Sequence, residues 1–515
     1  MHRAPLEYRN ICIECHPITS LPVQNTESNI TRPGEIFASR WGMLLTAVGI
    51  AIGTGNIWRF PRVAASNGGG VFILLWTAFL FLWSVPLLAT ESAIGRYTRR
   101  GTFGSFLALA GQRFSWMGAF VTLVTTGIMC YYCVVTGWCL KYFSAALIGT
   151  VNHSSGPEYW HAFSGSSQAV GFHLLTALLT GAIILAGVRS GIERSSQLFI
   201  PLLGAILVYS AVRALLLPGA GAGVSYLFHF DPADFARPRI YLEALSQSAW
   251  STGAGWGLLL TYSVYARPRE KVVKNSLLMG LIDNTASLLA ALAVIPTVFS
   301  MLPPDQAVEV VKTPGENSTG LTFIWIPRLL GGCDSGQAML ILFFLALLLA
   351  ALTSLISMVE MAVRNLIDLG LKRILATLLV TALIALAGVP SALSGKVFDN
   401  QDWVWGLGLL VNGLLFCVAV RVFGAKRFRE QVVNQAGNSD LQLGRVWEWL
   451  ILWLIPLQFC LLLGWWFYRS AGWNPGDWWN PLSTFSIGSC LLQWGLAAAL
   501  ALWLAPRLAR RVTRG

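Results

Sequence analysis

The chain has 515 residues, of which 55% are hydrophobic and 12% are charged, and its mean hydropathy is +0.61. Such a composition is too apolar for one soluble core and is typical of a polytopic membrane protein. A net charge of +12 could indicate a nucleic-acid partner. The basic residues are instead concentrated in alternate predicted loops, which is the distribution that membrane topology requires. We therefore expect membrane lipid around the chain and no nucleic-acid partner.

Hydropathy predicts an all-α chain with about twelve membrane spans. The apolar stretches lie near residues 42–66, 71–93, 115–148, 170–188, 196–217, 241–265, 275–300, 336–368, 373–392, 402–424, 446–468 and 484–506. Basic residues follow the even-numbered spans, for example at Arg99, Arg267 and Lys426. Under the positive-inside rule both termini are then cytoplasmic, in a multi-pass protein of the plasma (inner) membrane.

The first span contains an unusual stretch, Gly49 to Pro61. Three glycines, Asn56, Arg59 and a proline lie near the middle of a segment long enough to cross a bilayer. Irregular backbone at that depth is tolerated only where protein buries it or where it lines a wet cavity. An arginine inside the membrane is itself a functional-site hypothesis. A glycine-rich packing face with a snorkelling Arg59 is the alternative, but Asn56 and Arg59 add nothing to close packing.

This stretch resembles the first span of the neurotransmitter:sodium symporters, the LeuT-type sodium-dependent transporters. The resemblance rests on Gly53-x-Gly55-Asn56-x-Trp58-Arg59-Phe60-Pro61, followed by Asn67-Gly68-Gly69-Gly70. A second interruption in the sixth span reads Ser251-Thr-Gly253-Ala-Gly255-Trp256-Gly257. The resemblance implies the LeuT fold, a 5+5 inverted repeat with broken helices 1 and 6.

The resemblance also implies a division of the chain. Residues 1–33 are expected to be a cytoplasmic tail, and residues 34–425 the transporter core, with repeats at about 40–218 and 240–425. Residues 426–515 are expected to form two peripheral C-terminal helices and a basic tail, to which we assign no transport chemistry. Cys12-Ile-Glu-Cys15-His16 matches a haem-attachment spacing, but a cytoplasmic segment without a signal peptide does not favour that interpretation.

The function that the resemblance implies is sodium-coupled symport of a neutral, hydrophobic or aromatic amino acid by alternating access. Gly53 stands where amine carriers have an aspartate, which leaves room for the carboxylate of the substrate. Backbone N–H groups near Thr54 and Gly55, at the start of a half-helix, attract such a carboxylate. The expected substrate-binding residues are Ile50, Ala51, Gly53, Thr54, Gly55, Ile128, Tyr132, Trp250, Ser251, Gly253, Trp256, Ser354 and Met358.

The resemblance implies two sodium sites, and sodium, as a hard cation, prefers oxygen ligands there. The resemblance assigns the second site to Gly49, Ile52, Ala350, Thr353 and Ser354. It assigns the first site to Ala51, Asn56, Ser251 and Asp283. The alternative for Thr353 and Ser354 is that their hydroxyls only bond back to their own helix.

Asp283 departs from the family pattern, which usually has an asparagine at this position. A carboxylate beside the ion would supply the charge that chloride supplies in many animal relatives, so chloride is not expected to be required. Gln247, Ser251 and Ser287 would still suit an anion. Protonation of Asp283 could also couple to the loss of sodium, which leaves proton counter-transport as a variant.

Gating residues are implied at both ends of the pocket. Arg59 and Asp402 match the external pair, while Asp368 and a Tyr265–Glu360 contact belong to the inner side. The family usually has an arginine in the N-terminal segment, but the corresponding position in this sequence is Gly34. Either Arg32 replaces that arginine or the inner gate is looser.

The sequence bears on two further classes of function. A non-transporting amino-acid receptor or accessory membrane protein that keeps the fold is the alternative to transport. An enzyme is not expected, because no cluster of nucleophile, base and orienting group is evident among the spans. The sequence indicates no oligomeric state.

Overall fold

A computed structural model of the chain describes residues 35–151, 156–312, 320–330, 336–435, 440–473 and 475–513. Within these ranges ten helices are long and apolar enough to cross a membrane, and a bent pair, Arg40–Ala51 with Gly55–Ser66, makes an eleventh span. The interrupted pair Pro238–Ser251 and Leu258–Val264 corresponds to the sixth predicted span. The protein is therefore a multi-pass, all-helical membrane protein. The predicted tail, the Cys12–His16 motif and Arg32 lie outside the described residues.

The first five spans begin with a broken one. They are α1 (Arg40–Ala51) with η2 (Gly55–Arg59) and α2 (Phe60–Ser66); α3 (Gly70–Phe79) with η3 (Leu80–Ser84) and α4 (Val85–Thr98); α6 (Ser115–Leu147); α8 (Ser167–Leu185); and η5 (Val188–Glu193) with α9 (Arg194–Leu215).

The next five spans also begin with a broken one. They are α11 (Pro238–Ser251) with α12 (Leu258–Val264); α13 (Val272–Met301); α16 (Gly336–Asp368); α17 (Arg373–Ala387) with α18 (Val389–Leu393); and α19 (Gly395–Phe423). Two more spans follow, α21 (Arg445–Trp449) with η11 (Leu450–Leu454) and α22 (Ile455–Trp473), and then α23 (Ile487–Val512).

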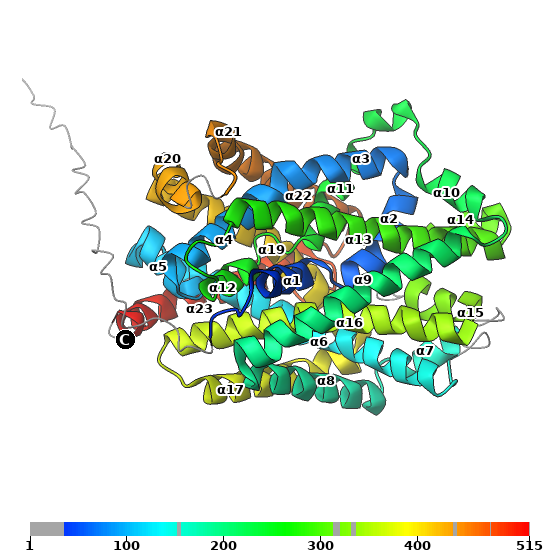
Figure 1. The fold of residues 1–515 in the computed structure, drawn as a ribbon, viewed down its shortest axis with the longest axis horizontal. Helices are drawn as coiled ribbons and strands as arrows, with labels where there is room; N and C mark the ends of the chain where they lie inside the picture. Colours follow the sequence, from blue (N-terminus) through cyan, green and yellow to red (C-terminus); the bar gives the residue numbers. More distant parts are fainter. Residues whose placement is uncertain are drawn as a thin grey trace, which may run out of the picture.

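Shorter helices connect the spans. They are α5 (Thr102–Ala110), η4 (Gln112–Phe114), α7 (Pro157–Phe163), α10 (Ala220–Leu227), η6 (Pro232–Ala236), α14 (Pro304–Lys312), η8 (Gly320–Trp325), α15 (Ile326–Leu330), α20 (Ala425–Phe428) and η9 (Arg429–Val433). Figure 1 shows α10, α14 and α15 at one end of the bundle and α5 and α20 at the other.

The two broken spans lie inside the bundle. α1 contacts α9, α13 and α16, and α12 contacts α4 and α16. Long helices surround this centre, and α8 and α17 lie side by side at its outside (Figure 1). The irregular backbone of the breaks is thus enclosed by protein, which is the condition for its survival at membrane depth.

Candidate functional site

The first span is broken directly after α1. Ile52 leaves the helical conformation (φ −77°, ψ 90°), and the chain resumes as the wide π-helical turn Gly55–Arg59 with a bend of 48°. The side chain of Asn56 holds the break, since its Oδ1 accepts a hydrogen bond from the Gly53 N–H at 2.9 Å. Backbone groups at such helix ends have no intrahelical partner and are available to ligands.

Glycine makes the break between α11 and α12 possible. Gly253, Gly255 and Gly257 have φ angles of 68°, 89° and 78°, in the left-handed region that glycine tolerates. A Cβ on Gly253 would lie 2.8 Å from Cγ2 of Ile50, and one on Gly255 would lie 3.0 Å from Cα of Gly413. The unwound segment can therefore approach the Ile50 side chain of α1 and the backbone of α19 closely.

Two side chains that the sequence analysis did not single out support this second break. Glu91 of α4 is fully buried, and its Oε1 accepts a hydrogen bond from the Gly255 N–H at 2.5 Å. Thr125 of α6 donates to the Trp256 carbonyl at 2.9 Å. The signal that could have indicated Glu91 is its presence in an apolar span, because a buried carboxyl needs partners.

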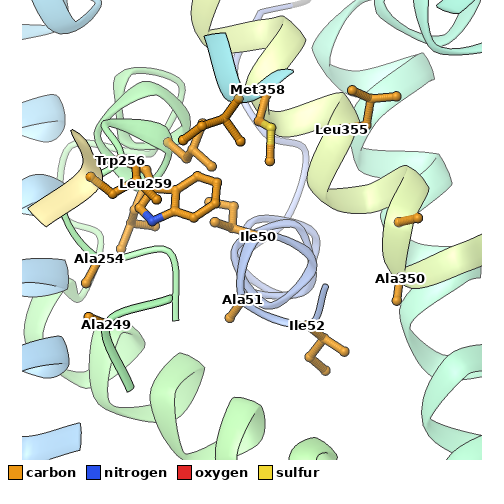
Figure 2. Packing of buried hydrophobic residues seen from close by; sticks show 14 of the residues in the cluster. Ile50, Ala51, Ile52, Ala249, Ala254, Trp256, Leu259, Ala350, Leu355 and Met358 are labelled. Carbon is orange, nitrogen blue, oxygen red and sulfur yellow. The ribbon is translucent and has the colours of Figure 1, made fainter. Parts of the chain in front are cut away.

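A cavity of about 840 Å³ lies between the two breaks and reaches solvent beside α14. Every predicted substrate-binding residue lines it. Figure 2 shows Ile50, Trp256 and Met358 close together around the end of α1. We call the end of the bundle with α14 the open end and the opposite one the closed end.

The polar part of the cavity lies at the first break. Both the N–H and the hydroxyl of Thr54 donate to the Tyr132 hydroxyl at 3.2 Å. A Cβ on Gly53 would lie 3.0 Å from Oγ of Ser354 and 3.2 Å from Oη of Tyr132. A side chain at position 53 would therefore crowd these two hydroxyls, whereas glycine keeps them at the cavity, where hydroxyl and N–H groups suit a carboxylate.

The three side chains predicted for the first sodium site meet in one cluster. Asn56 Nδ2 donates to Asp283 Oδ1 at 2.6 Å and to Ser251 Oγ at 3.1 Å. Ser251 Oγ donates to the two carboxylate oxygens of Asp283 at 2.9 and 2.8 Å. Ser287, which the site prediction did not include, accepts from Asn56 at 2.8 Å. A buried carboxylate with hydroxyl oxygens beside it is a ligand set that suits a hard cation, although the Asn56 amide oxygen is turned to the Gly53 N–H in this structure.

The residues predicted for the second sodium site lie where α16 faces α1. Ser354 Oγ donates to the carbonyls of Gly49 and Ile50, at 3.4 Å each. Thr353 bonds back to its own helix, at 3.1 Å to Leu349 and 3.0 Å to the Ala350 carbonyl. A Cβ on Gly49 would lie 3.1 Å from Cβ of Thr353, so Thr353 faces α1 and not lipid. A hydroxyl that donates to a carbonyl keeps lone pairs for a cation.

The predicted external gate is open in this structure. Arg59 and Asp402 both line the cavity, but no ion pair joins these two described residues. The guanidinium of Arg59 lies over the ring of Trp250, 5.1 Å from its centroid, and donates to Ser246 at 3.4 Å. Closing the gate would require Arg59 to move towards Asp402.

The closed end is held by charged and aromatic contacts. Tyr265 donates to Glu360 at 2.5 Å, and Arg373 contacts both oxygens of that carboxylate at 2.8 Å. Phe37 packs edge to face on Tyr265, with ring centroids 6.5 Å apart. Asp368 pairs with Arg364 at 2.7 Å. Arg373 was not predicted, since nothing in its local sequence indicates a partner thirteen residues earlier.

Glu193, also not predicted, holds the beginning of α1. Its carboxylate accepts hydrogen bonds from the N–H groups of Ala38 and Ser39, at 2.7 and 3.2 Å. A Cβ on Gly42 would lie only 1.8 Å from this carboxylate, so glycine is needed for the contact. The N–H groups just before α1 thereby gain an acidic partner from η5, and its negative charge lies near the N-terminus of the helix.

The C-terminal spans contribute to the cavity wall, although the sequence analysis assigned them no transport chemistry. Trp466, Arg469 and Trp473 of α22 line its outer part, as does Phe485 before α23. Trp403 of α19 anchors this segment by donating to the Ser486 carbonyl at 3.1 Å.

Comparison with known proteins shows which family the chain resembles along most of its length. Residues 34–170 and 163–504 match the profile of the Sodium:neurotransmitter symporter family. An uncharacterized sodium-dependent transporter of Methanocaldococcus jannaschii is 30% identical over 438 residues, which cover 81% of this chain and 87% of that protein. The uncharacterized sodium-dependent transporter YhdH of Bacillus subtilis is 29% identical, over 83% of this chain and 96% of that protein.

Among solved structures, the crystal structure of MhsT in complex with L-phenylalanine superposes with a TM-score of 0.71. The two sequences are 27% identical, and the match covers 83% of this chain and 98% of MhsT. The expectation of a LeuT-type fold is confirmed by this similarity together with the two broken spans.

Proposed function

The chain belongs to the sodium:neurotransmitter symporter family, a family of sodium-dependent transporters and not of enzymes, and on this premise we propose that it carries a neutral, hydrophobic or aromatic amino acid together with sodium. The observation that carries the proposal is the meeting of two broken spans at one cavity, with Ser354 on one side and the Asn56–Asp283 pair on the other. Half-helix ends and released carbonyls at membrane depth serve to bind a zwitterion and cations.

The cavity supports an amino acid as the cargo. Its polar corner at Gly53, Thr54 and Tyr132 offers donors to a carboxylate. Carbonyl groups at the ends of α1 and α11 would accept from the amino group. The remaining wall beside Ile128, Trp256 and Met358 is apolar, so it favours an uncharged hydrophobic side chain.

Sodium fits both predicted sites by ligand chemistry. Carbonyl and hydroxyl oxygens of Gly49 and Ser354 offer a neutral oxygen set, and the Asp283 carboxylate adds one full negative charge at the other site. Sodium bound at Asp283 would replace the Asn56 amide as the partner of that carboxylate. The two ions would thereby stabilise both breaks when the substrate is present.

Asp283 also supports transport without chloride. Ser251, which could hold an anion, donates its hydroxyl proton to Asp283. A fixed carboxylate next to an anion site repels a second anion. We infer that Asp283 supplies the negative charge and that chloride is not required.

The structure supports an orientation with the open end outside the cell. The closed end carries the basic loops, including Arg100 after α4 and Arg267 after α12. Under the positive-inside rule this end faces the cytoplasm of a cell whose plasma membrane the protein crosses. Alternating access would then consist of closing Arg59 towards Asp402 and opening the Tyr265–Glu360 contact.

Ligand-dependent stabilisation of the purified protein tests the proposal. L-Phenylalanine, L-leucine, L-tryptophan and glycine would be added in sodium chloride or in choline chloride, and the thermal midpoint measured. A ligand at 100 times its Kd stabilises by about 2.7 kcal/mol. We expect a rise with at least one hydrophobic amino acid, only in sodium; no sodium-dependent rise with any of them would refute the assigned substrate class.

Uptake into liposomes separates transport from the receptor alternative. Reconstituted protein should accumulate radiolabelled L-phenylalanine, or the best ligand from the stability test, when an inward sodium gradient is applied. Collapse of the gradient with a sodium ionophore should abolish accumulation. Binding without gradient-driven accumulation would favour the receptor.

A further inference from the structure

The outer part of the cavity carries an excess of basic side chains. Among the described residues that line the whole cavity, the basic ones are Arg59, Arg62, Arg239, Lys312 and Arg469, and the acidic ones are Glu243 and Asp402. Arg59 and Asp402 form the expected gate pair. The other basic residues outnumber the one remaining carboxylate, Glu243.

We use the name cationic ring for Arg62, Arg239, Lys312 and Arg469. These residues come from α2, from the start of α11, from the end of α14 and from α22. Four separate elements therefore bring positive charge to one opening.

Close contacts with described carboxylates are missing for three members of the ring. Nε of Arg62 is buried and has no hydrogen-bond partner among the described residues. The guanidinium of Arg469 lies over the rings of Trp473 and Trp465, 5.4 and 5.7 Å from their centroids. Within the described ranges, no carboxylate forms an ion pair with Arg62, Arg239 or Arg469.

The walls around the ring are largely aromatic. Trp403, Trp466, Trp473 and Phe485 line the same outer part of the cavity. Low-dielectric walls in a cleft lined by one sign of charge focus the electric field and raise the local concentration of oppositely charged solutes. The potential at this opening should therefore be positive and stronger than on an open surface.

We propose that the cationic ring is a charge filter, which favours zwitterionic and anionic amino acids over cationic amino acids and amines before they reach the central site. The proposal rests on the proposed function for its biological meaning, but the positive potential itself does not depend on transport. The filter complements the central site, whose apolar wall beside Ile128 and Met358 disfavours charged side chains of either sign.

The positive charge of the ring acts on sodium as well as on amino acids. Sodium must pass the same opening and is also repelled by the ring. Removing positive charge should therefore speed sodium binding and weaken the discrimination against cationic amino acids. Damage to the fold would instead slow sodium binding and the uptake of all amino acids.

A charged thiol probe measures the potential directly. Ser66 lines the cavity one helical turn after Arg62, and Ser66→Cys is a conservative change. Purified Ser66→Cys protein would be treated with sulfonatoethyl methanethiosulfonate (anionic) or trimethylammonioethyl methanethiosulfonate (cationic). Each rate would be divided by the rate with a free thiol, and the protein with native Ser66 gives the background from other cysteines.

We expect the anionic reagent to react roughly ten times faster than the cationic one after this correction. The ratio should fall towards one in high salt, because exposed charges are screened. It should also fall when Arg62→Gln and Arg469→Gln are added, and it should not change with Lys274→Gln, a control at the exposed start of α13. A corrected ratio of one or less in low salt would overturn the proposal without any need for the arginine variants.

The selectivity prediction is tested separately. In the Arg62→Gln/Arg469→Gln variant, inhibition of L-phenylalanine uptake by L-lysine should strengthen several-fold, and the rate of sodium binding should rise. If the reagent ratio is as expected but no amino acid is bound or carried, the proposed function fails and the positive potential stands. If uptake is normal but the ratio is one, the filter fails alone.

Discussion

Asn56 and Asp283 lie in different halves of the bundle, yet Asn56 Nδ2 donates a hydrogen bond of 2.6 Å to Asp283 Oδ1. Asn56 belongs to the break after α1, and Asp283 lies in the middle of α13. Both side chains are fully buried. The pair thus links the first break to a fixed negative charge, and a cation at this point would compete with the Asn56 amide for the carboxylate.

Replacement of chloride tests the role of Asp283. Uptake by the wild type should not change when chloride is replaced by gluconate, because the carboxylate supplies the negative charge. Asp283→Asn keeps the volume and removes the charge, and we expect its uptake in gluconate to fall by about tenfold or more relative to chloride. A large loss in the wild type would show that Asp283 does not substitute for chloride.

Protons and sodium should compete for the same carboxylate. The apparent sodium affinity of the wild type should therefore fall as the pH is lowered, approaching about tenfold per pH unit once most of the Asp283 carboxyl is protonated. Sodium titrations followed by tryptophan fluorescence would measure it. Asp283→Asn should abolish this dependence; the same pH profile in both proteins would place the titrating group elsewhere.

Loss of an oxygen ligand tests the second sodium site. Thr353→Ala and Ser354→Ala should each weaken sodium binding by about tenfold, since a hydrogen-bonding or ligating oxygen contributes about 1–3 kcal/mol. Thr285→Ala is the control, because Thr285 is exposed on α13 and its hydroxyl only bonds back to Leu281, at 2.8 Å. Equal effects of all three variants would contradict the assignment.

The Arg373–Glu360 ion pair should keep the closed end of the bundle closed. Arg373→Ala leaves the fully buried Glu360 without its charged partner, a change that typically costs about 3–5 kcal/mol. We expect a lower thermal midpoint and greater labelling of a cysteine placed at the closed end. Adding Glu360→Gln should restore part of the stability; no recovery in the double variant would mean that Arg373 acts through other contacts.

Gly42 tests the contact between Glu193 and α1. In Gly42→Ala the new Cβ would collide with the Glu193 carboxylate, so we expect destabilisation of about 1–3 kcal/mol through loss of the hydrogen bonds to Ala38 and Ser39. Gly204→Ala in α9 is the matched control, because a Cβ there meets nothing within 4 Å. Alanine should stabilise that helix by about 0.5–1 kcal/mol. Similar effects of both variants on the thermal midpoint would refute the argument.

Features that depend on local composition could be predicted from the sequence. A cluster of glycines around Asn56 and another around Gly255 mark the broken spans, since an apolar helix does not need them. Resemblance to a family then located the residues that line the cavity. Asp283 could be recognised as unusual because the family usually has an asparagine at this position.

Features that depend on pairing across the bundle could not be predicted. Glu91 reaches Gly255 across a sequence separation of 164 residues, and Glu193 reaches Ala38 across 155. The sequence shows each carboxyl as an acidic residue at the edge of an apolar stretch. It does not show which backbone group that carboxyl contacts. The partner of the Glu360 carboxylate is another example, since Arg373 of α17 holds it and nothing in the sequence indicates that pairing.

The sequence by itself determined that this chain crosses a membrane many times, that two of its spans are broken, and which residue types stand at the breaks. Hydropathy and backbone freedom are properties of consecutive residues, so they can be read along the chain. Only the tertiary structure decided that Ser354 faces Gly49, that Arg59 stands apart from Asp402, and that α22 brings Arg469 to the opening. Such relationships come from the packing of helices distant in sequence, where the position and rotation of each helix are set by all of its neighbours together.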